Sequence, residues 1–136
     1  MKSNNLYEQL LKLIAPDQIT DNFELVEIIE KSHSISFIFV EKDDHIPIDL
    51  QGKEVVLDGF VNHLELQTFP LRDKTVYMIV RRRRWKEKGK PEESYTNQYD
   101  LHYTGMKTTK EFGDFLKEEL GLQPTEYNRI WESLTN

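Results

Sequence analysis

Four consecutive arginines, Arg81–Arg84, are the part of this 136-residue sequence whose residue types and spacing point most clearly to chemistry. A guanidinium group binds a phosphate through two parallel N–H bonds and also stacks on planar rings, which an ammonium group does not do. Trp85 follows directly. Because basic groups combined with aromatic rings are typical of nucleic-acid contacts, this run predicts binding of a phosphate-rich polymer.

The basic residues are concentrated in one segment, residues 72–90, although the whole chain has a formal net charge of -6. This segment holds nine basic and two acidic residues, or +7, while the other 117 residues hold nine basic and 22 acidic ones, or -13. An anionic remainder would confine contact with a polyanion to the cationic strip. The candidate DNA-binding residues are Arg72, Lys74, Arg81, Arg82, Arg83, Arg84, Trp85, Lys86, Lys88 and Lys90.

The elements that must position these side chains are predicted to be strands. The stretch Val76–Val80 is apolar at every position, which is typical of a central strand covered on both faces. It is preceded by a strand over residues 62–69 and by a turn in the segment FPLRDK, residues 69–74, so residues 62–85 are predicted to form a hairpin. Successive strand residues point to opposite faces. Arg81 and Arg83 should therefore share one face, and Arg82 and Arg84 the other.

The rest of the chain predicts an α+β fold in a single domain, residues 1–136. We expect a helix over 4–15, a β-hairpin over 23–41 and a strand over 54–60. Residues 94–103 alternate, with Tyr95, Tyr99, Leu101 and Tyr103 on one face, and should pair with the arginine strand. A helix capped by Thr108 or Thr109 should end at Gly121, and a second should cover 124–136. The prediction is a mostly antiparallel sheet of five or six strands, with one N-terminal and two C-terminal helices.

Several classes of protein do not fit. The chain has no cysteine, which excludes disulfides, a thiol nucleophile and thiolate zinc sites, and favours a reducing, cytoplasmic location. It has no apolar run of about 18 residues that could cross a membrane. Three carboxylates on a βαβ fold could hold two catalytic metal ions, but the spacing of Asp49, Asp58, Glu65 and Asp100 shows no such set. We therefore predict no catalytic residue, no metal site and no cofactor, and expect that the protein is not an enzyme.

The cationic strip is also compatible with roles that do not involve duplex DNA. Edge strands often carry positive charge that prevents aggregation, and the strip could pair with acidic residues of the chain itself. It could dock on an acidic protein partner, which would make the chain an interaction module. Single-stranded DNA or RNA could also stack on Trp85 and the tyrosines.

The string QTFPLRDKTVYMIVRRRRW, followed by TTKEFGDFLKE, resembles the N-terminal region family of certain bacterial insertion-sequence transposases. The likeness covers about residues 5–120, and the phrase from FPLR to RRRW is its most specific part. The matching residues are Phe69, Pro70, Leu71, Arg72, Lys74, Val76, Tyr77, Arg82, Arg83, Arg84 and Trp85. Related transposase front ends place cysteine pairs around a similar hairpin, whereas this chain has none.

The resemblance implies a non-catalytic accessory region that recognises the ends of the mobile element during transposition. Members are typically short reading frames or the front end of a transposase, upstream of the catalytic domain. The expected partners are therefore duplex DNA and, as the alternative, an acidic surface such as that of the catalytic transposase subunit. A footprint of roughly 5 to 7 phosphates would give a log–log salt slope near -5 to -6.

Overall fold

Two short helices precede the sheet in the computed structural model, which describes residues 2–121 and the side chains of residues 6–121. Helix α1 (Lys2–Ile14) agrees with the predicted helix to within two residues. Pro16 ends it and opens α2 (Asp17–Asn22), whose only buried residue is Ile19. The sequence did not reveal α2, because a six-residue polar segment with one apolar side chain has no helical stripe. No helix in residues 2–121 is long and apolar enough to cross a membrane.

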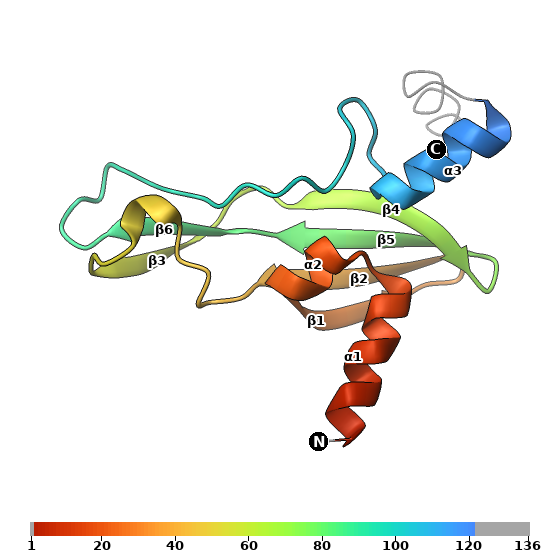
Figure 1. Cartoon of the computed structure of the whole chain (residues 1–136), viewed down its shortest axis with the longest axis horizontal. Helices are drawn as coiled ribbons and strands as arrows, with labels where there is room; N and C mark the ends of the chain where they lie inside the picture. The colour runs from red at the N-terminus through yellow and green to blue at the C-terminus, as the bar shows by residue number, and fades with distance from the viewer. Residues whose placement is uncertain (1, 122–136) are drawn as a thin grey trace.

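Six strands form two sheets in this part of the chain, so the predicted single sheet is wrong (Figure 1). Strands β1 (Phe23–Glu30), β2 (Ser34–Glu41), β5 (Lys74–Arg81) and β4 (Leu64–Leu71) lie in that order in the larger sheet. The predicted hairpins β1–β2 and β4–β5 are both present. The two hairpins pair with each other through β2 and β5. These two strands are parallel, so the sheet is mixed. Joining through these strands gives both a central position, where their apolar side chains lose most solvent.

The smaller sheet pairs β3 (Val55–Phe60) with β6 (Arg83–Glu87) in antiparallel orientation. β3 leads into β4, and β5 leads into β6. One long two-stranded ribbon therefore runs from the smaller sheet into the larger one. The ladder of the ribbon is interrupted at Arg82, and this interruption between the two sheets is here called the bend; the Arg82 carbonyl accepts a hydrogen bond from Val61 N–H at 3.0 Å. Figure 1 shows β3 and β6 extending past the end of the four-stranded sheet. The arginine run therefore crosses this interruption instead of lying in one continuous strand as predicted.

The main core lies on one face of the larger sheet. Phe39, Leu66 and Met78 are buried there with the α1–α2 corner and with Leu101, which comes from the segment after β6. The opposite face holds Tyr77 and Ile79, which are only half-buried. Within the described residues, the central strand β5 is thus fully covered on one face, whereas the sequence predicted cover on both.

Helix α3 (Lys110–Leu120) begins and ends where the sequence predicts. The Thr109 hydroxyl accepts a hydrogen bond from Phe112 N–H, and Gly121 adopts a left-handed conformation, with φ of 67°, at the end of the helix. Phe112 packs edge-to-face against Phe69 of β4, with ring centroids 5.0 Å apart. The second helix predicted over 124–136 lies outside the described residues.

The segment between β6 and α3, residues 88–108, is here called the return segment. The strand predicted at 94–103 is wrong: the segment makes a single bridge to β6, through two 2.8 Å backbone hydrogen bonds between Tyr95 and Trp85. Beyond Tyr95 its polar side chains bind other partners, and Leu101 enters the core. Because the bridge is antiparallel, a continued ladder would run from β6 back to β5, whose two edges are already paired with β2 and β4.

Candidate nucleic-acid interface

The bend between the two sheets gathers Arg81, Arg82 and Arg83. Within the described residues, none of these three guanidinium groups forms an ion pair with a carboxylate. Burial of three unpaired charges would be costly, and Arg81 is exposed while the other two are partly exposed. Among the described residues, the bend is therefore the part of the ribbon whose guanidinium groups have no ion-pair partner.

Arg81 and Arg83 lie on the ring of Phe60, with their guanidinium carbons 4.8 and 5.4 Å from its centroid. The prediction that these two arginines share a face is confirmed. A cation above an aromatic ring is attracted by the ring's quadrupole, and the guanidinium can still donate from its N–H edges. Phe60 thus holds two cations side by side without neutralising them.

Arg82 points to the return segment. Its Nη1 donates to the Asn97 carbonyl at 3.0 Å and to Gln98 Oε1 at 3.1 Å. Both acceptors are neutral, so Arg82 is held in place by hydrogen bonds that form no ion pair.

The four cations that follow the bend are paired with carboxylates. Arg84 Nε and Lys86 Nζ both lie 3.1 Å from Asp58 Oδ2 on the neighbouring strand β3. The hydrogen bond from Lys86 lowers the pKa of the Asp58 carboxyl, and the charges of Lys86 and Arg84 lower it further. Lys88 and Lys90 lie within 4 Å of Glu54 and Glu87, at 3.9 and 3.7 Å.

The remaining candidates lie apart from this group. Lys74 begins β5 and pairs with Glu30 at 2.6 Å, which lowers the pKa of that carboxyl. Arg72 is exposed in the β4–β5 turn, at the opposite end of β5 from Arg81. Trp85 is only 3% exposed, and its indole N–H has no acceptor among the described residues. The sequence predicted Trp85 as a stacking surface, but in this structure its ring lies inside the protein.

Glu41, the last residue of β2, is a residue that the sequence reasoning missed. Its carboxylate is fully buried at the bend and accepts hydrogen bonds from Arg83 N–H at 2.8 Å, from Asn97 Nδ2 at 2.9 Å and from the Tyr99 hydroxyl. Burial and this last bond raise the pKa of Tyr99, so the hydroxyl remains a donor at neutral pH. A glutamate at a strand end usually meets solvent, and nothing local in the sequence distinguishes this one.

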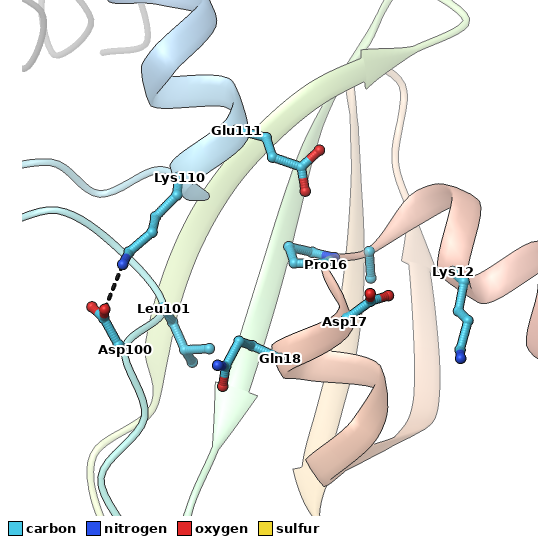
Figure 2. A pocket seen from close by; sticks show the side chains of 9 residues that line it. Lys12, Pro16, Asp17, Gln18, Asp100, Leu101, Lys110 and Glu111 are labelled. Atoms are coloured by element: carbon cyan, nitrogen blue, oxygen red, sulfur yellow. Dashed lines mark hydrogen bonds and ion pairs between the residues drawn. The ribbon is translucent and has the colours of Figure 1, made fainter.

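A separate cavity of about 460 Å³ lies between the α1–α2 corner, the return segment and the start of α3 (Figure 2). Charges of both signs line it, including the Lys110–Asp100 ion pair at 2.5 Å. Asp17, Glu111 and Lys12 are the other charged residues at its wall, and all three are exposed. No group of three His, Asp or Glu side chains in the described residues is arranged to hold a metal ion.

Comparison of the chain with protein-family models, with curated proteins and with solved structures finds no match.

Proposed function

We propose that this chain is a non-catalytic DNA-binding accessory region of an insertion-sequence transposase, which contacts the ends of the element through the bend of its long ribbon. The observation that carries the proposal is a set of three adjacent arginines that form no ion pair within the described part of the chain, Arg81, Arg82 and Arg83. The likeness of residues 69–85 to transposase N-terminal regions supplies the biological context.

The contact would use the charges in two groups. Arg81–Arg83 are ready to meet phosphates, because no ion pair has to be broken first. Arg84, Lys86, Lys88 and Lys90 would have to exchange a carboxylate for a phosphate. Exposed ion pairs are individually weak and are screened by salt, so this exchange is feasible on a polyanion.

The experiment is a titration of the protein with duplexes of the element's terminal repeats at several salt concentrations. Each neutralised phosphate adds about -0.9 to the log–log slope, so Arg81–Arg83 alone predict about -3 and full engagement predicts about -6. A triple variant, Arg81→Ala with Arg82→Ala and Arg83→Ala, should lose most of this affinity and slope. A slope near zero for the unchanged protein would remove the proposal.

The matched control replaces three cations outside the bend, Lys31, Lys107 and Lys117, by alanine. All three side chains are exposed and form no ion pair within residues 6–121. This control changes the net charge as much as the arginine variant does. Equal loss of affinity in both variants would show that net charge, and not the bend, determines binding.

A second candidate function is docking on an acidic protein, such as the catalytic transposase subunit. It is favoured by Val56 and Leu57 of β3, which are 45% and 47% exposed on the same small sheet as the paired cations. Phosphate binding does not need exposed apolar side chains, whereas protein interfaces use them. A pull-down with the catalytic subunit after nuclease treatment, compared between the unchanged protein and Leu57→Lys, separates the two functions. Capture that Leu57→Lys abolishes would favour docking, and no capture would remove it.

A further inference from the structure

The buried carboxylate of Glu41 occupies the point where the larger sheet ends and the arginine ribbon bends. The parallel pairing of β2 with β5 ends at Val40 and Arg81. At the next residue, Glu41, the backbone pairing stops, and hydrogen bonds between Glu41 and Arg83 connect the two strands instead. Its carboxylate Oε1 accepts from Arg83 N–H at 2.8 Å, and its backbone carbonyl accepts from Arg83 Nε–H at 2.7 Å.

The same carboxylate also holds the return segment. Oε2 accepts from Asn97 Nδ2 and from the Tyr99 hydroxyl, and Asn97 Nδ2 donates in addition to the His45 carbonyl at 2.6 Å. Arg82 takes its two acceptors from this segment, at Asn97 and Gln98. The Glu41 carboxylate therefore holds the backbone of Arg83 and also the segment that supplies the acceptors of Arg82.

A buried carboxylate is costly unless donors satisfy its oxygens, and removal of one partner leaves the others unpaired. Here all of the donors come from the two segments that meet at the bend. The cost of burying Glu41 is offset only when β6 and the return segment are both in place. This arrangement couples the burial of the carboxylate to the geometry of the arginines.

We propose that Glu41 is a positioning residue, which fixes Arg82 and Arg83 at the bend before a ligand binds. The consequence for DNA binding rests on the proposed function, but the positioning itself does not. Preorganised side chains lose less conformational entropy when they bind, so loosening them weakens binding.

The sign of the effect on DNA binding separates positioning from simple electrostatics. Glu41→Gln removes a negative charge next to the arginines, and electrostatics alone would then strengthen binding to a polyanion. The glutamine side chain has an NH2 group in place of one carboxylate oxygen. At least one N–H group that donated to Glu41 would then face another donor and lose its hydrogen bond. Positioning therefore predicts weaker binding, by about three- to tenfold, with a shallower salt slope.

The matched control is Glu65→Gln, because Glu65 is an exposed carboxylate on β4 without an ion pair in the described residues. It should bind DNA as tightly as the unchanged protein or slightly more tightly. Tyr99→Phe supplies a variant without a change of charge. It keeps the ring that packs on Phe23 and removes one hydrogen bond to Glu41, so it should weaken binding less than Glu41→Gln does.

The direct readout is NMR of Arg83, whose N–H and Nε–H both donate to Glu41. In Glu41→Gln we expect the Arg83 amide to exchange at least tenfold faster relative to the amide of Val80, while circular dichroism shows a folded protein. Unchanged protection of Arg83, or tighter DNA binding by a folded Glu41→Gln variant, would overturn the inference. If the unchanged protein binds no DNA, the proposed function fails, and the exchange of Arg83 still decides whether Glu41 positions it.

Discussion

At the scale of single residues, the four arginines have the same side chain but differ in the groups that they contact. Arg84 has the same side chain as Arg82, yet it meets Asp58 while Arg82 meets neutral acceptors of the return segment. An ion pair reduces the potential that a phosphate experiences, and a neutral hydrogen bond does not. The positions of Asp58, Glu54 and Glu87 therefore decide which cations of the ribbon are paired.

Asp58→Asn is expected to strengthen DNA binding by about two- to fivefold, because it releases Arg84 and Lys86 together. Fluorescence anisotropy with a labelled duplex measures the change. Asp43→Asn is the control, since Asp43 is an exposed loop residue with no ion pair in residues 6–121. Equal gains in both variants would mean that only net charge changed.

Acid should weaken the Asp58 ion pairs in a defined direction. Because the folded-state pKa of Asp58 is lowered, its contribution to stability is present above the usual aspartate pKa and is lost as the pH falls below it. Asp58→Asn should therefore reduce the loss of thermal stability between pH 5 and pH 3, measured as the shift in melting temperature. An identical shift in both proteins would contradict this.

At the scale of elements, the ribbon depends on a tight turn and on its bend. Arg72 and Asp73 connect β4 to β5 with φ of 50° and 66°. Two successive positive φ values define a type I′ turn, whose twist matches that of the paired strands. This turn aligns β4 with β5 and so fixes which residues of the ribbon reach the bend.

Asp73→Gly should stabilise the protein by about 0.5–1 kcal/mol, because glycine adopts this left-handed conformation without a steric penalty. Arg72, a candidate contact, is left unchanged. Urea denaturation measures the free energy of unfolding. Asp73→Val should destabilise, since a β-branched residue is strained at positive φ, and a stable valine variant would refute the assignment of the turn.

Thr109→Ala should destabilise the protein by about 1–2 kcal/mol. The Thr109 hydroxyl caps α3 through Phe112 N–H and also forms a buried hydrogen bond with the Thr68 hydroxyl at 3.0 Å. Thr109→Ser keeps both bonds and should cost much less. Equal unfolding midpoints for the alanine and serine variants would show that the cap contributes nothing.

At the scale of the whole molecule, the ribbon extends from a core that does not include its outer part. The main buried cluster draws on α1, α2, the larger sheet and Leu101, and none of its residues comes from β3 or β6. The smaller sheet is held by its ladder, its ion pairs, the hydrogen bonds at the bend and the buried ring of Trp85. We expect a region outside the main core to open without global unfolding.

The rate of amide hydrogen exchange should therefore differ between the inner and the outer part of the ribbon. The amides of Val76–Val80 should exchange by global unfolding, whereas those of Lys86 and Glu87 should exchange through local opening, about ten- to a hundredfold faster. Native-state exchange in increasing denaturant distinguishes the two, because local opening exposes little surface and depends little on denaturant. Equal exchange and equal denaturant dependence along the ribbon would instead show one cooperative unit.

The sequence was enough to predict the elements whose signals are local. The helix before Pro16, the hairpins β1–β2 and β4–β5, and the cap at Thr109 follow from periodicity, turn residues and side-chain hydrogen bonds a few positions apart. The shared face of Arg81 and Arg83 follows from the two-residue repeat of a strand, which continued across the bend. The concentration of positive charge in residues 72–90 also follows directly from the sequence.

Which strands became neighbours, and which arginines stayed unpaired, depended on the packing of distant segments. The parallel pairing of β2 with β5 depends on how two hairpins pack, and residues 94–103 alternate like a strand but enter the core. Glu41 lies 42 positions from Arg83 and 58 from Tyr99. No local pattern encodes such contacts, because the free energy that buries a carboxylate arises only once its distant donors have been brought to it.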